Sequence, residues 1–112
     1  MTQMKKADVD RELDEFGRFS EPALLILISL ADGPKHGYAM TEDIARIADL
    51  RLGPGTLYGA ITRLERDGLI EPLKSDDRRQ PYRLTAEGRR VLRAKLATLY
   101  QFARAGLRKL EA

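Results

Sequence analysis

The chain has 112 residues, a net charge of +3 and no cysteine. This length favours one domain, and the lack of cysteine excludes a disulfide framework, a thiolate nucleophile and a cysteine metal site. The longest apolar run, Ala23 to Ile28, is far shorter than the roughly 20 residues that cross a bilayer. The acidic segment from Asp8 to Glu15 does not have the pattern of a signal peptide. We therefore expect a cytoplasmic protein that uses no membrane and no cofactor.

The first predicted helix begins at Asp8 and ends near Gly17. Val9, Leu13 and Phe16 recur at i, i+4 and i+7, which places them on one face. Asp8 can accept a hydrogen bond from the first turn as a cap. Because so short a helix is marginal alone, it needs a surface on which to pack.

Two further helices are predicted on either side of the breakers Asp32, Gly33 and Pro34. The first, Ala23 to Ala31, is apolar on nearly every side, which is typical of a buried helix. The second runs from Tyr38 to Ala48. It should direct Ile44 and Ala48 inward and Glu42, Asp43 and Arg46 outward.

The helix predicted over Pro54 to Asp67 has two distinct faces. Proline suits a first helical position and Gly68 suits the left-handed residue after the last turn, while Leu57, Ile61 and Leu64 form an apolar stripe. The opposite face carries Thr56, Gly59, Thr62, Arg63 and Arg66, with Tyr58 at its border. The small residues Gly59 and Ala60 leave two interpretations open: close approach to a DNA major groove, or packing against a neighbouring helix.

A short hairpin follows this helix. Leu69 to Lys74 and Tyr82 to Leu84 read as strands joined by the polar turn Ser75 to Pro81, and Thr85 can cap the next helix. Residues 51 to 93 carry 10 basic and 6 acidic side chains, so the positive charge gathers on this half of the chain.

The last predicted helix runs from Thr85 to the end of the sequence. Its apolar residues follow a heptad-like spacing of 4, 3, 4, 4 and 3, which is typical of a helix that packs along a partner. One domain of this size cannot cover the whole seam, so we expect a symmetric homodimer. The residues of the seam are Leu92, Leu96, Leu99, Ala103, Leu107 and Leu110.

An enzyme is not expected. Glu42 with Asp43, and Asp76 with Asp77, are adjacent solvated acids without a neighbouring nucleophile or glycine-rich phosphate loop. The single histidine, His36, is more typical of a helix cap than of a metal ligand or a catalytic base.

Four motifs resemble the PadR family of bacterial transcriptional regulators. They are H-G-Y at 36 to 38, G-T-L-Y at 55 to 58, R-L-E-R-D-G-L-I at 63 to 70 and Y-R-L-T-A-E-G at 82 to 88, in that order. The resemblance implies a mainly α winged helix-turn-helix with a small β-hairpin wing. It divides the chain into an N-terminal helix and arm (1–21), a DNA-binding unit (22–84) and a C-terminal dimerisation helix (85–112), with the N-terminal helix also joining the dimer.

The resemblance also implies the partners: an inverted-repeat operator in double-stranded DNA, a second copy of the chain, and an aromatic or lipophilic effector. The residues expected to contact bases in the major groove are Thr56, Tyr58, Thr62 and Arg63. From the wing, Arg78 and Arg79 are expected to reach the flanking groove or its phosphates. Contacts to the DNA backbone are expected from Arg66, Lys74 and the hydroxyl of Tyr38, a residue that should otherwise lie partly in the core. Some short relatives bind flat aromatic ligands against tryptophan, which this chain lacks. The candidates in its place are Phe16, Phe19, Tyr100 and Phe102. A winged helix that binds only proteins remains the alternative function.

Overall fold

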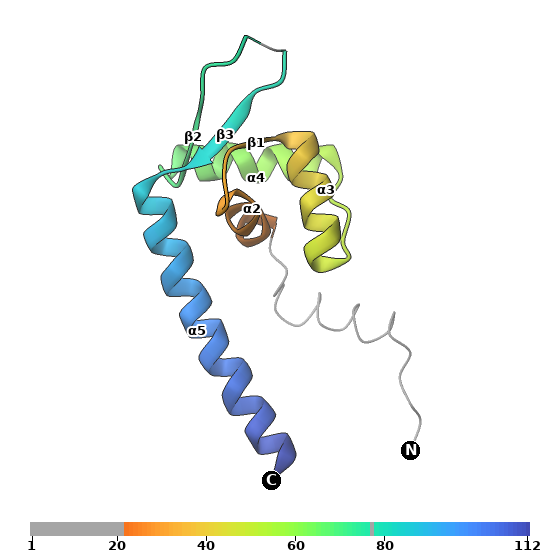
Figure 1. Ribbon diagram of the computed structural model, residues 1–112, viewed down its shortest axis with the longest axis vertical. Coiled ribbons are helices and arrows are strands. Elements are labelled where there is room, and N and C mark those ends of the chain that lie inside the picture. Colours follow the sequence, from red (N-terminus) through yellow and green to blue (C-terminus); the bar gives the residue numbers. More distant parts are fainter. Residues whose placement is uncertain (1–21, 77) are drawn as a thin grey trace.

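The computed structural model describes residues 22–76 and 78–112. The helix predicted near residues 8–17, with Val9, Leu13 and Phe16, lies outside the described residues, and so does Phe19. The described elements are α2 (Pro22–Leu30), β1 (Lys35–His36), α3 (Gly37–Ala48), α4 (Pro54–Arg66), β2 (Ile70–Pro72), β3 (Pro81–Leu84) and α5 (Ala86–Glu111) (Figure 1). This order confirms the predicted winged helix-turn-helix, mainly α with a small β wing.

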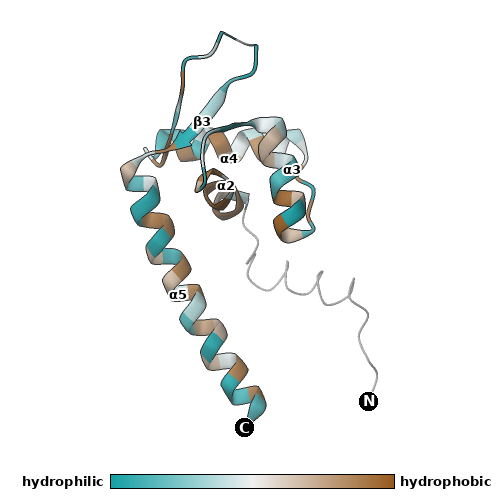
Figure 2. Cartoon of the chain, viewed as in Figure 1, coloured by the Kyte–Doolittle hydropathy of each residue, from teal (hydrophilic) through white to brown (hydrophobic). Residues whose placement is uncertain are grey.

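Helix α2 forms the centre of the core, and α3, α4 and α5 all pack against it (Figure 2). Its apolar composition explains this position, because burial of apolar surface is the main favourable term in folding. Leu24 and Ile28 are only half-buried, so the prediction of burial on every side is wrong for a single chain. The neighbouring elements cover only part of its circumference. Its buried apolar residues are Leu25, Ile26, Leu27 and Leu30.

Local signals fix the start of both helices of the helix-turn-helix and the end of α4. His36 caps α3, since its Nδ1 accepts a hydrogen bond from the backbone amide of Ala39 at 3.3 Å. Pro54 opens α4 after Gly53. At the other end Gly68 has a φ of 76°, and the amide of Leu69 donates to the carbonyl of Leu64 at 3.0 Å, which is the bond that closes a helix on a left-handed residue.

The sheet has three antiparallel strands in the order β1-β3-β2. Lys35 pairs with Tyr82, and Ile70 with Leu84. The strand β1 was not predicted, because two polar residues carry no alternating pattern. The strand predicted over 69–74 is shorter and ends at Pro72. Beyond it the amide of Leu73 still donates to the carbonyl of Pro81 at 3.0 Å, but Pro81 has no amide hydrogen to return the second bond of that pair.

Helix α5 leaves the core and extends well beyond it (Figure 1). Its first turn is capped by Thr85, whose Oγ1 accepts from the amide of Gly88 at 2.9 Å and donates to the carbonyl of Gly68 at 2.6 Å. Leu92 is buried in the core of its own chain, which corrects its assignment to the dimer seam. Neither α5 nor another helix within residues 22–76 and 78–112 is long and apolar enough to span a bilayer.

Asp43 is not the solvated surface acid that was predicted. Its Oδ2 accepts a hydrogen bond of 2.7 Å from the hydroxyl of Ser29, which is buried in α2, and it lies 4.0 Å from the ammonium group of Lys35. The spacing on α3 alone could not indicate this, because both partners belong to other elements. Asp43 thus connects α2, β1 and the helix-turn-helix.

Replacing Asp43 by alanine should destabilise the fold by about 1–3 kcal/mol, because the buried hydroxyl of Ser29 loses its partner. Chemical denaturation monitored by circular dichroism would measure the loss. Glu42→Ala is the matched control, since that neighbouring carboxylate pairs with Arg51 at the surface and should cost well under about 1 kcal/mol. Equal losses in the two variants would contradict the role of Asp43.

Candidate nucleic-acid interface

Helix α4 separates a buried face from a polar one. Leu57, Ala60, Ile61 and Leu64 are buried, whereas the opposite side exposes Thr56, Tyr58, Thr62, Arg63 and Arg66. The two small residues divide between these faces. Ala60 is fully buried, as the packing interpretation requires. A Cβ on Gly59 would meet only the guanidinium of Arg63, at 3.8 Å. The absence of a side chain at Gly59 therefore allows another molecule to approach the outer face of α4 closely.

The exposed face offers hydrogen-bond donors and positive charge. The hydroxyl of Thr62 donates to the carbonyl of Tyr58 at 2.9 Å, which leaves its oxygen able to accept. Arg66 lies 3.4 Å from Asp67, so part of its charge is balanced. Arg63 has no acidic partner among the described residues. Of the side chains on this face, Arg63 is therefore the best placed to reach a guanine edge or a phosphate.

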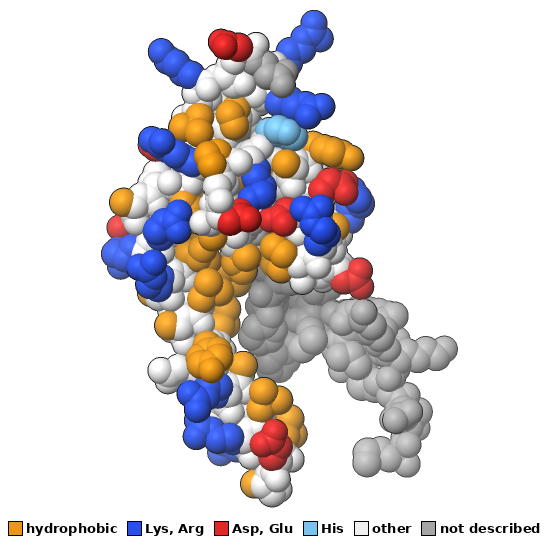
Figure 3. Space-filling view, viewed as in Figure 1, with side chains coloured by type: hydrophobic (Ala, Val, Ile, Leu, Met, Phe, Trp, Pro, Cys, Tyr) orange, Lys and Arg blue, Asp and Glu red, His pale blue; other side chains and the backbone are white. Residues whose placement is uncertain are grey.

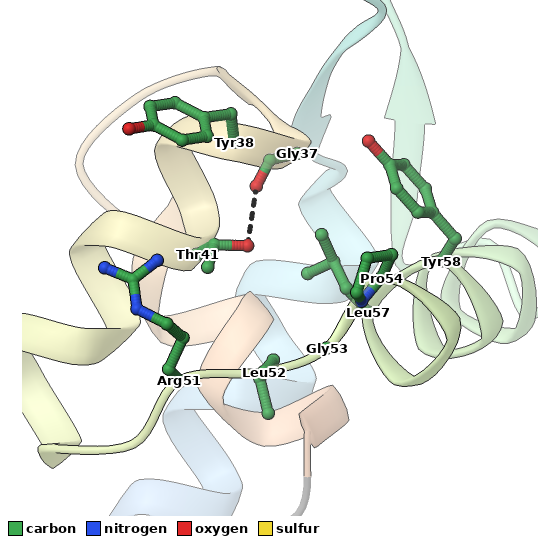
Figure 4. A pocket seen from close by; sticks show the side chains of 9 residues that line it. All are labelled: Gly37, Tyr38, Thr41, Arg51, Leu52, Gly53, Pro54, Leu57 and Tyr58. Atoms are coloured by element: carbon green, nitrogen blue, oxygen red, sulfur yellow. Dashed lines mark hydrogen bonds between the residues drawn. The ribbon is translucent and has the colours of Figure 1, made fainter.

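A cleft of about 410 Å³ lies between the N-terminal parts of α3 and α4 (Figure 4). Tyr38 and Tyr58 stand on its two sides, and Arg51 approaches it from the connecting loop. The hydroxyl of Tyr58 fits against Gly37, where a Cβ would lie 2.6 Å from it. Tyr38 is 66% exposed, so the expectation that it is partly core is wrong. Its ring lines the same cleft as Tyr58 of α4.

Arg51 is a charged residue of this surface that the sequence interpretation missed. Its guanidinium lies 3.0 Å from the carboxylate of Glu42, and this arginine holds the pKa of Glu42 below its usual value. The signal was available, because Arg51 is the basic residue in the short loop that joins the two helices of the helix-turn-helix.

The wing places further basic side chains near α4. Lys74, Arg78 and Arg79 are all exposed, and Lys and Arg side chains project from the wing end of the molecule (Figure 3). Arg83 is bound to Glu71 across the strands at 2.6 Å, which balances its charge.

Gln80 holds the two sides of the wing hairpin together, and Tyr82 attaches the wing to the core. Gln80 uses its amide to bind the carbonyls of Leu73 and Pro81 at 2.7 and 2.9 Å, so its NH₂ group closes the hairpin. Tyr82 packs against the core, and burial raises the pKa of its hydroxyl, with Glu65 and Tyr58 adding to the effect. The orientation of the wing relative to α4 is therefore set by packing.

The proposed ligand residues Tyr100 and Phe102 lie on the projecting part of α5, where they are 62% and 67% exposed. The guanidinium of Arg104 lies 5.6 Å from the ring centre of Tyr100, within the range of a cation–π contact. The described residues contain no group of three or more His, Asp or Glu side chains suited to a metal ion.

Comparisons with known proteins agree with this arrangement. The model of the transcriptional regulator PadR-like family matches residues 26–94. The transcriptional regulator Rv3488 of Mycobacterium tuberculosis is 40% identical over 84 residues, which cover 72% of this chain and 78% of that protein. An uncharacterized 37.1 kDa protein in a transposon of Streptomyces fradiae is 47% identical over 75 residues; these cover 67% of this chain, and the chain spans only 22% of that relative.

Among solved structures, a PadR family transcriptional regulator from Eggerthella lenta superimposes with a TM-score of 0.71 at 29% identity. The alignment covers 93% of each chain, so the likeness includes the projecting α5 as well as the winged helix. The chain therefore belongs to the PadR-like family of transcriptional regulators.

Proposed function

We propose that the protein is a sequence-specific DNA-binding repressor that places α4 in the major groove of an inverted-repeat operator. The observation that carries the proposal is the division of α4 into a buried apolar face and an exposed face of hydroxyls and arginines. A helix in the groove reads base edges with a few of its exposed side chains. Thr56, Tyr58, Thr62 and Arg63 take this role here. Arg66, Lys74, Arg78, Arg79 and the hydroxyl of Tyr38 bind phosphates or the flanking groove.

The protein acts as a homodimer in this proposal. Support comes from the apolar side chains of α5 that its own domain leaves uncovered, since Leu96, Leu107 and Leu110 are 39%, 59% and 84% exposed. A second copy would cover this face and set the separation of two α4 helices. Residues 85–112 then form the dimerisation helix, with residues 1–21 as an additional arm and 22–84 as the DNA-binding unit.

Regulation would follow from the same dimer. A small aromatic or lipophilic effector would bind near Tyr100 and Phe102, with Phe16 and Phe19. It would cause release of DNA if it bound more tightly to a dimer arrangement that cannot bind DNA than to the one that can. Family membership in transcriptional regulators agrees with a binding protein rather than an enzyme. Binding to operator DNA would place the protein in the cytoplasm.

Selection from a pool of random DNA duplexes tests the proposal. The purified protein should enrich an inverted repeat whose half-sites lie about one helical turn, or a multiple of it, apart. Recovery of unrelated sequences after repeated rounds would contradict sequence-specific recognition, and recovery of single half-sites would contradict the dimer.

Arg63→Ala should weaken operator binding by about tenfold or more and relax the preference at one base pair, as for loss of a bidentate base contact. The double change Arg78→Ala with Arg79→Ala should instead weaken selected and random duplexes alike and reduce the salt dependence, because phosphates carry no sequence information. Titrations of each variant with both duplexes would measure the difference. The assignment of Arg63 fails if its removal leaves both affinity and preference unchanged.

A further inference from the structure

The ring of His36 has one nitrogen committed to the fold. Its Nδ1 accepts the amide hydrogen of Ala39 as the cap of α3, at 3.3 Å. A nitrogen that accepts a hydrogen bond carries no proton, so the proton of the neutral ring resides on Nε2. Nε2 of His36 is therefore a hydrogen-bond donor.

This donor faces a second donor from the wing. Nη1 of Arg79 lies 3.4 Å from Nε2 of His36. A guanidinium has no acceptor, and the protonated Nε2 has none either, so neither group satisfies the other. Two N–H donors held this close share an interaction only if an acceptor lies between or beside them.

The surroundings favour an anion as that acceptor. His36 and Arg79 line a hollow of about 440 Å³ together with Arg78, Tyr38 and Tyr58, and none of its described lining residues is acidic. The hollow opens at the N-terminus of α3, where the helix dipole is positive and favours negative charge. Tyr58, from the proposed reading helix, borders the same hollow.

We propose that one backbone phosphate of each operator half-site binds between Nε2 of His36 and the guanidinium of Arg79. This inference rests on the proposed DNA-binding function. A tetrahedral phosphate presents two oxygens, one for each donor, and it joins the wing to the start of α3. Because Tyr58 stands beside the hollow, a phosphate held there fixes how α4 enters the groove.

His36→Asn separates this role from that of the cap. Asparagine is among the best helix caps and retains an oxygen acceptor for the amide of Ala39, but it lacks the ring N–H. The variant should keep the melting temperature of the wild type and bind the selected operator about tenfold more weakly, as expected for a hydrogen bond to a charged group.

A double-mutant cycle tests whether His36 and Arg79 share one phosphate. Arg79→Ala alone should weaken binding, and its combination with His36→Asn should be less than additive, because groups with a common partner are coupled. Arg78→Ala is the matched control, since it removes the same charge from the adjacent position and should be additive with His36→Asn. Additive losses for Arg79, or unchanged affinity of His36→Asn, would overturn the inference.

Operator duplexes with single methylphosphonate linkages locate the phosphate. One neutral linkage in each half-site should weaken the wild type, weaken His36→Asn less because only Arg79 still contacts that phosphate, and have no effect on the variant that carries both His36→Asn and Arg79→Ala. If no linkage behaves this way while the unmodified operator still binds, the inference fails and the proposed function stands. A hollow that responds to inorganic phosphate in NMR titrations but to no DNA linkage would assign it to the free anion and overturn the inference. Lack of operator binding by the wild type would overturn both proposals.

Discussion

Gly88→Ala is expected to destabilise the protein by about 3 kcal/mol or more, at the upper end of overpacking effects. A Cβ at this position would lie 1.9 Å from the carbonyl oxygen of Leu69. That oxygen already accepts the amide of Thr85 at 3.1 Å, and neither it nor the helix backbone can rotate away as a side chain could. The first turn of α5 would have to move away from Leu69, which lies between α4 and β2. The melting temperature should fall by about 10 °C or more.

Gly55→Ala is the control for this prediction. A Cβ on Gly55 meets nothing within 4 Å, and alanine is the better helix former by up to about 1 kcal/mol. The control should therefore melt at or above the wild-type temperature. Similar melting temperatures for Gly88→Ala and Gly55→Ala would show that α5 does not pack as tightly on Leu69 as described.

Replacing Leu107 and Leu110 together by glutamate is expected to produce a folded monomer. Both side chains are largely exposed in the single chain, so the substitution costs the monomer little, whereas two charges in a helix–helix interface cannot be solvated. A monomer can bind only one half-site at a time and lacks the avidity of a dimer that binds both. Its affinity for the inverted repeat should therefore fall by about a hundredfold or more.

Thr98→Glu with Gln101→Glu adds the same charge to the opposite side of α5 and should remain a dimer. Sedimentation velocity gives the mass of each variant, and operator titration gives its affinity. A Leu107 and Leu110 variant that still sediments as a dimer would remove this face of α5 from the proposed interface.

The sequence predicts elements well where the signal is local. Pro54, Gly68 and the apolar stripe between them define α4 to within one residue of its observed end. Thr85 and His36 act as the caps that their positions indicated. Each of these signals depends on backbone geometry and periodicity within a few residues.

Features that depend on residues distant in the sequence could not be predicted. Gly88 is required by the carbonyl of Leu69, and Asp43 is drawn inward by Ser29. Leu92 fits the heptad spacing, yet its position near the start of α5 puts it in the core of its own chain. Periodicity identifies the apolar face of a helix but not the surface that covers it.

The candidate site likewise has features that the local sequence predicts and features that depend on distant residues or on a partner. The exposure of Thr56, Thr62 and Arg63 follows from the helical period and is confirmed. Their contact with DNA stays a prediction, because it depends on a partner. The donor pair of His36 and Arg79 was not visible in the sequence, since strand β1 and the returning strand of the wing bring the two together.

The most direct test of the account is a fluorescence-anisotropy titration of the wild-type protein with the selected operator and a shuffled duplex of the same composition, at about 50 and 200 mM salt. The account predicts that the operator binds at least about a thousandfold more tightly than the shuffled duplex at the higher salt. It also predicts that affinity for both falls steeply as the salt concentration rises. Equal affinity for the two duplexes, or affinity unaffected by salt, would contradict a reading helix supported by phosphate contacts.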